Sequence, residues 1–383
     1  MTSFHAISLC LLFSLSACAQ KQPGFENNLH PIGQNGQDSG SAKTIYQRMK
    51  EIGVPGVSIA LFDGGRIVFE KAYGTKDQSA PVDTNTLFQA ASISKPLTSV
   101  ATFRLYERGI IPIDTDVNTL LQGWKVPDTV YDATEKVTVR RIISHMGGLS
   151  VHGFRGYKRT EQLPTIIQTL NGVPPSNSPR IEVDTTPGVI EIYSGGGFVI
   201  LQLLLQEKTQ KPFAQILSEE VLRPAGMIHS TFVQPLPDSL IPFAAKGFQS
   251  NGKPVAGGFH VYPEQAPAGL WTTPSDLARF MLRVGDAYRD GDGLIKQSTA
   301  RMMLTRVPNG SGEGFGLDGD SSTLRFRHSG GNFGYTCYAI SFAGTGKGII
   351  VMTNSDNGSN LIHEIVRAIS KEYGWGPLWP GEH

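Results

Sequence analysis

The chain has 383 residues and a formal net charge of +1, with 39% hydrophobic and 17% charged residues. A globular chain of this length buries a large core, either as one big domain or as two lobes. Its near-neutral charge gives no electrostatic reason to expect nucleic acid as a partner.

The N-terminus has the features of an export signal. Residues 6–15, AISLCLLFSL, form an apolar run that is too short for a stable membrane-spanning anchor. The LSAC that follows resembles the bacterial lipobox, whose cysteine, here Cys18, is lipidated and becomes the new N-terminus. The same place also fits ordinary signal cleavage, so both outcomes stay open. We expect a signal over 1–18 and an exported, periplasmic lipoprotein, with Ala19 resembling the residue that follows the cysteine in outer-membrane lipoproteins.

The first ordered elements follow a polar stretch. Residues 19–41 lack apolar periodicity and are rich in Gly, Asn and Gln, which predicts a flexible tether. A helix is expected over 42–53, because three apolar residues share one face and a glycine ends it. Two strands are expected at 56–63 and 66–74, and the Gly-Gly pair between them predicts a hairpin.

The middle of the chain is mostly helical. A helix that contains Lys95 is expected to run to about Arg108, and the segment 143–149, ISHMGGL, indicates a helix end that enters a glycine turn. The strongly apolar segment 196–210 predicts another helix. Thr273 is the expected N-cap of a further helix, with proline at its first position and aspartate completing a capping box.

Strands return near the C-terminus and determine the predicted fold. The segments 323–331, 334–343 and 346–355 alternate or run apolar over strand lengths, with glycine-rich breaks between them. A last helix is expected over 361–374. Strands at both ends of the ordered chain favour an α/β (α+β) fold, in which one antiparallel sheet is built from both ends and flanked by helices.

A single domain over 42–376 is therefore predicted, with a mainly helical lobe inserted into the sheet lobe. The sheet lobe is expected over about 42–110 and 285–376, and the helical lobe over about 111–284. A cleft between the two lobes is the default location for a functional site.

A Ser-x-x-Lys pattern occurs twice, at Ser92–Lys95 and at Ser250–Lys253. The second pair lies in a glycine-rich turn, whereas the first lies at a predicted helix start, where residues three apart are neighbours. A serine hydroxyl is a poor nucleophile until a base takes its proton, and a lysine can be that base when burial lowers its pKa. Taken alone, the first pair is explained equally well as a solvated first turn of a helix.

Two further segments carry candidate site residues. Tyr193 precedes a serine and a glycine run at the entry to an apolar helix, where its ring can pack on the core and its hydroxyl can face a cleft. His328, Ser329 and Gly330, followed by Gly331, end a predicted strand, and glycine there lets the backbone approach a ligand closely. Packing alone, or a plain strand end, is the alternative for each segment.

The ordered set Ser-x-x-Lys, Tyr-Ser-x and His-x-Gly resembles the serine β-lactamase and penicillin-binding protein superfamily. It is most similar to the class C β-lactamase-related serine hydrolases of the S12 peptidase type, over about residues 44–370. Three supporting segments also resemble that family: ISHMGGLS from 143, LRPAGMIHSTF from 222 and PAGLWTTPSDLARF from 267.

The resemblance implies catalytic roles for three side chains. Ser92 would be the acylated nucleophile, Lys95 would help to deprotonate it, and Tyr193 would relay the proton to the leaving group. The backbone N–H groups of Ser92 and Gly331 would form the oxyanion hole. The fold implied is that of the β-lactamases and transpeptidases.

The resemblance also places His328, Ser329 and Gly330 along the cleft, with Ser329 contacting the substrate. Two positions depart from the pattern of many β-lactamases. Gly195 stands where asparagine is common, and its missing amide cannot contact an acyl side chain. His328 stands where most have lysine, and an unperturbed histidine is mostly neutral at pH 7. Both departures weaken the case for efficient antibiotic hydrolysis.

Other reactive side chains fit structural roles better. Cys337 alternates with apolar residues in a predicted strand, so a buried cysteine is favoured over a nucleophile. His145 follows the structural turn of the resembled family and is expected to be structural. The histidines lack metal-ligand spacing, so neither a metal nor a cofactor is expected.

We therefore expect an exported serine hydrolase that acts on a small-molecule substrate or on a cell-wall peptide or ester. The alternatives are a true class C β-lactamase or a D-Ala-D-Ala carboxypeptidase. An alternative of another class is a non-catalytic lipoprotein that binds peptidoglycan or penicillin. We expect a monomer that meets the membrane through its N-terminal lipid anchor.

Overall fold

A computed structural model of the chain describes residues 24–33 and 36–379. The predictions for the export signal and for Cys18 lie outside these residues. None of the helices within the described residues combines the length and the apolar character that crossing a bilayer requires.

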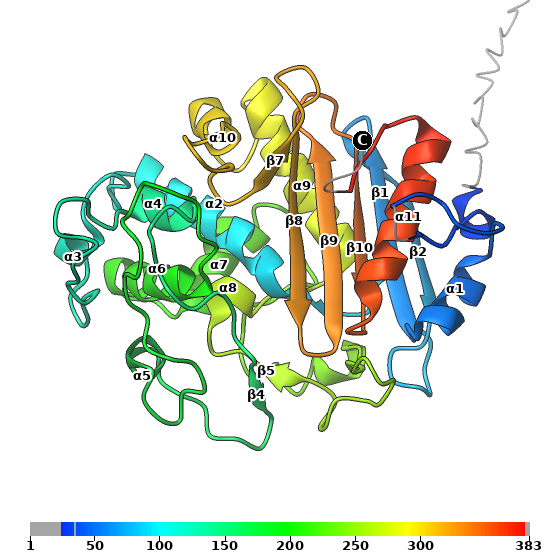
Figure 1. The fold of residues 1–383 in the computed structure, drawn as a ribbon, viewed down its shortest axis with the longest axis horizontal. Helices are drawn as coiled ribbons and strands as arrows, with labels where there is room; N and C mark the ends of the chain where they lie inside the picture. The colour runs from blue at the N-terminus through cyan, green and yellow to red at the C-terminus, as the bar shows by residue number, and fades with distance from the viewer. Residues whose placement is uncertain (1–23, 34–35, 380–383) are drawn as a thin grey trace, which may run out of the picture.

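One six-stranded antiparallel sheet is built from both ends of the chain, as the sequence predicts (Figure 1). Its N-terminal hairpin turns at Gly64 and Gly65, whose φ values of 57° and 77° favour glycine. The strands, in their order across the sheet, are β2 (Arg66–Gly74), β1 (Gly56–Asp63), β10 (Gly348–Thr353), β9 (Tyr335–Phe342), β8 (Arg325–Asn332) and β7 (Gly316–Asp318).

Helices cover both faces of the sheet, so its central strands are buried on both sides. On one face α11 (Gly358–Tyr373) packs over β9 and β10 beside α1 (Ile45–Ile52). On the other face α9 (Pro274–Asp290) packs along β1, β2, β9 and β10, and α10 (Gln297–Met303) follows it. Figure 1 shows α11 in front of the sheet and α9 behind it.

The structure adds detail at two of the predicted boundaries. Helix α9, whose first residues fall within the predicted helical lobe over 111–284, packs on strands of the sheet. Within the predicted tether over 19–41, Phe25 and Leu29 are buried in the core between the sheet and α11. Two apolar side chains without periodicity, together with ion pairs such as Lys71–Glu26, thus attach the described part of that segment to the domain.

The helical lobe lies beside the β8 edge of the sheet (Figure 1). The apolar helix α6 (Gly195–Thr209) forms its centre. Helix α2 (Ser94–Glu107) lies between α6 and the sheet lobe, and its residues Leu97, Val100 and Phe103 are fully buried. The helices are α2 (Ser94–Glu107), α3 (Val117–Leu120), α4 (Val139–Ile143), α5 (Ile166–Asn171), α6 (Gly195–Thr209), α7 (Phe213–Leu217) and α8 (Gln265–Ala268). Two small antiparallel pairs accompany them: β3 (Phe88–Gln89) with β6 (Trp271–Thr272), and β4 (Tyr157–Lys158) with β5 (His260–Val261).

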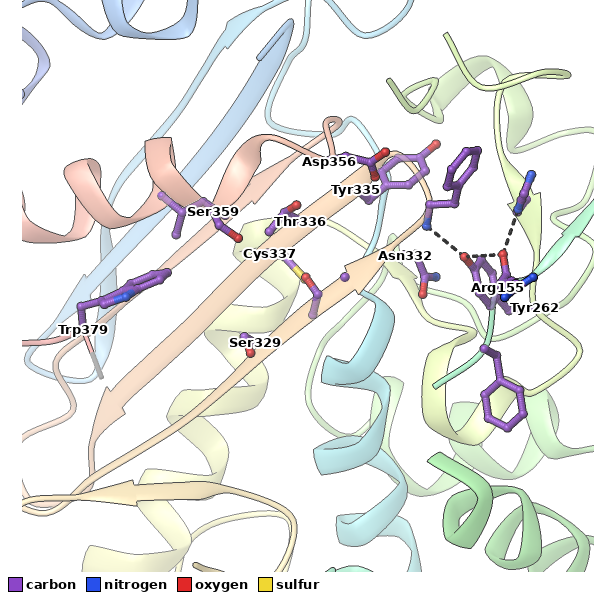
Figure 2. A pocket seen from close by; sticks show the side chains of 16 residues that line it. Arg155, Tyr262, Ser329, Asn332, Tyr335, Thr336, Cys337, Asp356, Ser359 and Trp379 are labelled. Carbon is purple, nitrogen blue, oxygen red and sulfur yellow. Dashed lines mark hydrogen bonds between the residues drawn. The ribbon is translucent and has the colours of Figure 1, made fainter. Parts of the chain in front are cut away.

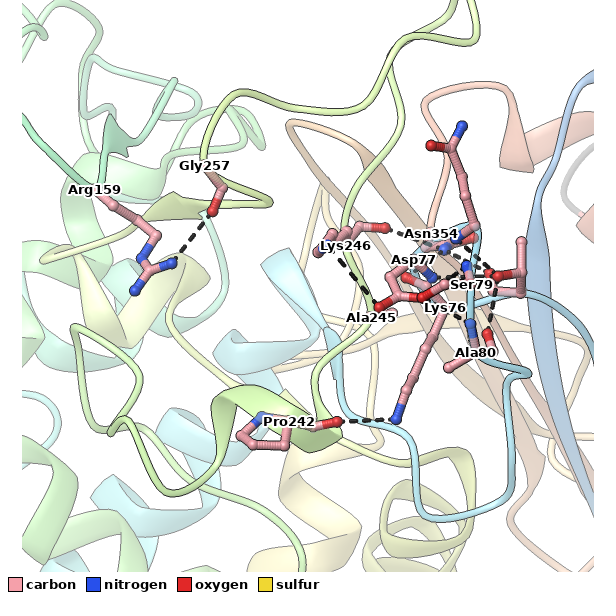
Figure 3. A network of polar contacts seen from close by, with 12 residues as sticks. Lys76, Asp77, Ser79, Ala80, Arg159, Pro242, Ala245, Lys246, Gly257 and Asn354 are labelled. Atoms are coloured by element: carbon pink, nitrogen blue, oxygen red, sulfur yellow. Dashed lines mark hydrogen bonds and ion pairs between the residues drawn. The ribbon is translucent and has the colours of Figure 1, made fainter.

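A polar network joins the two lobes (Figure 3). The buried Asn354 amide at the end of β10 donates to the Thr75 carbonyl at 3.2 Å and to the Lys246 carbonyl at 3.1 Å. Lys76 Nζ donates to the Pro242 carbonyl at 2.9 Å. These bonds satisfy loop carbonyls of both lobes, so the lobes are held in one relative position beside the site.

Candidate active site

Ser92 lies in a single 3₁₀ turn, Ala91–Ile93, that leads directly into α2. Ala91 before it adopts φ +49°, a left-handed conformation that a residue with a Cβ rarely takes. The two serines of this stretch have different environments. Ser92 is partly exposed, whereas Ser94 is buried, donates to the Ala91 carbonyl at 2.6 Å and accepts from the Leu270 N–H at 3.1 Å. Ser94 therefore holds the turn that presents Ser92.

Lys95 is a buried amine directed at the serine. Its Nζ donates to Ser92 Oγ at 3.0 Å and to the Pro267 carbonyl at 3.1 Å, and only 2% of the residue is exposed. Burial lowers the pKa of Lys95 from 10.5 to about 7, because the low-dielectric surroundings disfavour its charged form. A substantial fraction of the amine is thus neutral at physiological pH and able to accept a proton.

Tyr193 reaches the site from the loop before α6. Ser194 caps that helix by accepting from the Gly197 N–H at 3.0 Å, which fixes the backbone next to Tyr193. The Tyr193 ring lies 4.8 Å from Lys95 Nζ. Burial raises the pKa of Tyr193 to about 12, although interaction with the Ser92 side chain opposes the rise.

His145 packs beneath Tyr193, with the two ring centroids 4.3 Å apart. Its Nδ1 accepts from the Ser194 N–H at 3.1 Å, so the proton of the neutral ring is on Nε2. Burial first, and then the nearby Lys95 amine, hold the pKa of His145 well below its usual value. His145 therefore supports the tyrosine as a neutral packing residue, in line with the structural role expected of it.

His328, Ser329, Gly330 and Gly331 lie on β8 where that strand becomes the sheet edge, because β7 pairs with β8 only as far as Arg327. His328 Nδ1 donates to the Ser329 carbonyl at 2.6 Å, and its ring centroid lies 6.3 Å from that of Tyr193. Burial first, and then the charge of Lys95, lower the pKa of His328 to about 3. The imidazole is therefore neutral at pH 7.

The two glycines of this edge have opposite surroundings. A Cβ on Gly330 would lie 2.2 Å from the Ala90 carbonyl oxygen, whereas a Cβ on Gly331 would meet nothing within 4 Å. Gly330 is therefore required for β8 to approach the turn that carries the serine. At Gly331 there is open space where a side chain would stand.

This contrast gives a first prediction on stability. Gly330→Ala is expected to destabilise the protein by about 1–3 kcal/mol, because the strand must move away from the Ala90 carbonyl. Gly331→Ala, the matched control, is expected to change the free energy of unfolding by less than about 0.5 kcal/mol. Urea unfolding of both variants measures the difference. Equal stabilities would show that the close approach at Gly330 is absent.

Sequence reasoning missed Asn332, which holds this edge in place. Its buried Nδ2 donates to Gln89 Oε1 at 2.8 Å and to the Ala268 carbonyl at 3.1 Å. The period-2 alternation of a strand puts Asn332 on the same face as His328 and Gly330, so the signal was present in the sequence. Its partners lie far away along the chain, and nothing local indicates them.

Two cavities meet at Ser329. One, of about 880 Å³, is lined by Tyr193, His328 and the 306–318 segment. The other, of about 770 Å³, lies between the helical lobe, the end of β8 and α11, and residues of all three line it, among them Phe154, Tyr262, Gly331, Phe333, Ser359 and Trp379 (Figure 2). Within the described ranges, no three His, Cys, Asp or Glu side chains are grouped closely enough to hold a metal ion.

The structure thus brings Ser92, Lys95, Tyr193 and His328 into one site between the lobes. Cys337 lies directly behind it, fully buried, with Sγ 3.0 Å from the Ala90 carbonyl oxygen. Burial raises the pKa of its thiol far above the usual range. This favours the packing role predicted for it, because a thiol that stays protonated is a poor nucleophile.

Comparison with known proteins adds the following similarities. The profile of the family described as Beta-lactamase matches residues 42–369. Penicillin-binding protein 4* of Bacillus subtilis (strain 168) is 23% identical, over 85% of this chain and 74% of that protein. A beta-lactamase of Providencia stuartii is 24% identical over 73% of this chain, which spans 63% of that relative. The octameric penicillin-binding protein homologue from Pyrococcus abyssi superposes with a TM-score of 0.70 at 22% identity, covering 86% of this chain and 76% of that one, which shows a shared fold.

Proposed function

The chain belongs to the Beta-lactamase family of serine hydrolases, and from this premise we propose that it hydrolyses an ester or amide through an acyl-enzyme on Ser92. The observation that carries the proposal is the 3.0 Å contact between Lys95 Nζ and Ser92 Oγ. It occurs where burial lowers the pKa of the amine to about 7. A neutral amine at that distance can take the hydroxyl proton as the oxygen attacks.

In the proposed reaction, Ser92 Oγ attacks the substrate carbonyl carbon and its proton passes to Lys95. The backbone N–H groups of Ser92 and Gly331 hold the oxyanion. Because its pKa is about 12, Tyr193 is protonated at neutral pH and donates to the leaving group rather than acting as a phenolate base. The Lys95 proton then replaces the one that Tyr193 gave up. Water then attacks the acyl carbonyl carbon, the acyl–Oγ bond breaks, one proton of the water returns to Ser92 Oγ, and the carboxylic acid leaves.

The test is the intact mass of the folded protein after separate incubation with a fluorophosphonate and with a penicillin. We expect a covalent adduct with the fluorophosphonate. Fast turnover of nitrocefin would indicate a true β-lactamase, whereas a persistent penicillin adduct would favour a penicillin-binding peptidase. Absence of any adduct, with circular dichroism showing an intact fold, would leave the non-catalytic binding protein as the better interpretation.

A second prediction concerns His328. The low pKa, about 3, makes His328 neutral throughout pH 5–8, so it supplies no titrating positive charge to a substrate carboxylate. The pH profiles of kcat/KM for an anionic ester and for a neutral ester of similar size are therefore expected to run parallel over this range. An anionic substrate that alone loses activity as pH rises from 5 to 8 would show that His328 acts in its charged form.

Export and lipidation at Cys18 are part of the same proposal, as is a monomeric state. Export and lipidation are supported by the apolar run and the LSAC sequence of the N-terminus. Metabolic labelling with palmitate in a Gram-negative host, compared between the natural chain and Cys18→Ser, tests the anchor. Equal labelling of both would refute it, and size-exclusion chromatography with light scattering measures the oligomeric state.

A further inference from the structure

If the proposed function holds, the position of Tyr193 indicates which of the two cavities receives the leaving group and which receives the acyl group. A proton donor must lie within hydrogen-bond reach of the atom that it protonates. Tyr193 lines only the 880 Å³ cavity, so the leaving group points there. The acyl group then extends past Gly331 into the 770 Å³ cavity.

The acyl-side cavity has an aromatic wall formed by His260, Tyr262 and Phe333. The rings of His260 and Phe333 stack with centroids 4.7 Å apart and planes 26° apart. The Tyr262 hydroxyl accepts from the Phe333 N–H at 3.0 Å, as Figure 2 shows, and His260 Nδ1 lies 3.0 Å from the Arg155 carbonyl. These polar atoms already have backbone partners, so what the wall offers to a ligand is mainly ring surface.

Phe154 extends this wall toward the reacting centre. A Cβ on Gly195, two residues from Tyr193, would lie 3.1 Å from Phe154 Cε2 and 3.1 Å from the His152 carbonyl oxygen. The Phe154 ring therefore occupies the space that a side chain at position 195 would take. Because Phe154 also lines the acyl-side cavity, it links the region beside Tyr193 to the aromatic wall.

We propose that this enzyme prefers an apolar, ideally aromatic, acyl group, and that Phe154 is a specificity-determining residue for it. Offset or edge-to-face packing of an aromatic acyl group against such rings adds affinity beyond the area that it buries. The leaving-group cavity differs in character, since Glu191, Arg306 and Asn309 line it. The substrate class is accordingly an aromatic acyl group joined to a polar leaving group.

The experiment compares kcat/KM for p-nitrophenyl phenylacetate and p-nitrophenyl acetate, which share one leaving group. We expect the phenylacetate to be preferred at least about tenfold. Phe154→Ala is expected to reduce that ratio about tenfold, and Phe154→Leu, which keeps apolar volume, to reduce it by a smaller factor. Phe243→Ala is the matched control, because Phe243 is 53% exposed and lines neither cavity.

The outcomes separate the two proposals. A ratio near one in the natural protein, or a preference that both Phe154 variants retain in full, would overturn the acyl-group assignment while leaving the hydrolase intact. No turnover of either ester and no fluorophosphonate adduct would overturn the proposed function and this inference with it. A preference lost only in the Phe154 variants supports the assignment.

Discussion

Ser92→Ala is expected to lower kcat on esters by at least roughly 10⁴-fold, because Ser92 Oγ is the serine hydroxyl that the Lys95 amine contacts. The fluorophosphonate adduct should disappear at the same time. The melting temperature should change little, since Ser92 is partly exposed and its loss opens no cavity. Stopped-flow or steady-state kinetics with a p-nitrophenyl ester and intact-mass measurement give the two readouts.

Ser94→Ala is the matched control for that experiment. Ser94 lies only two residues after Ser92, but its hydroxyl donates to the Ala91 carbonyl and accepts from the Leu270 N–H inside the core. Its removal leaves the buried Leu270 N–H without this acceptor, whereas the Ala91 carbonyl keeps its bond from the Ser94 backbone N–H. The loss should cost about 1–3 kcal/mol of stability while the adduct still forms. If Ser92→Ala keeps more than about one per cent of the activity, or if the adduct moves to Ser94, the nucleophile has been assigned wrongly.

Much of the fold follows from local sequence signals. The glycine pair between two apolar runs predicts the β1–β2 hairpin, and Thr273 does cap α9 by accepting from the Asp276 N–H. The sheet built from both ends of the chain follows from the longer strand patterns, which lie towards those two ends. For the hairpin and the helix cap, the signal lies within a few residues of the feature that it determines.

What could not be predicted depends on contacts between distant segments. The bond from Asn332 to Gln89 joins residues 243 apart in the chain. The packing of Phe154 against Gly195 likewise depends on where the helical lobe folds back, and no local pattern reveals it. The pKa values of Lys95 and His328 follow from burial, which appears only once the lobes are assembled.

Lys95→Met is expected to lower kcat by a factor comparable to that of Ser92→Ala, since the variant keeps the volume but has no base. In the natural protein, kcat/KM should rise about tenfold between pH 6 and 8, because only the neutral amine accepts the serine proton and its pKa is about 7. Retention of more than about one per cent of the activity in Lys95→Met would show that another group is the base.

The same substitution should make the protein more stable at pH 7, because the buried amine is costly to fold. The pKa of Lys95 falls from 10.5 in the unfolded chain to about 7 in the folded one, a difference of 3.5. At about 1.4 kcal/mol for each pH unit this costs roughly 5 kcal/mol well below pH 7 and about 4 kcal/mol at pH 7, where half of the folded protein has already lost the proton. The two hydrogen bonds of Lys95 Nζ offset part of this cost, because each stabilises the folded protein by about 1 kcal/mol. Lys95→Met is therefore expected to gain about 2 kcal/mol at pH 7.

The sign of this gain depends on pH, whereas a gain that came only from better apolar packing of methionine would not. Between pH 7 and 10.5 the unfolded chain binds the Lys95 proton and the folded protein does not, so the natural protein gains stability as pH rises through this window. The advantage of Lys95→Met should shrink across it and vanish near about pH 9, where the remaining cost of the amine equals the two hydrogen bonds. Near pH 10.5 the natural protein should be the more stable one, because the two lost hydrogen bonds are then the main difference. Urea unfolding of both proteins at pH 6, 7, 9 and 10.5 gives the difference curve. A flat difference would mean that the amine keeps its ordinary pKa in the folded protein, and its role as the base would then lose its physical basis.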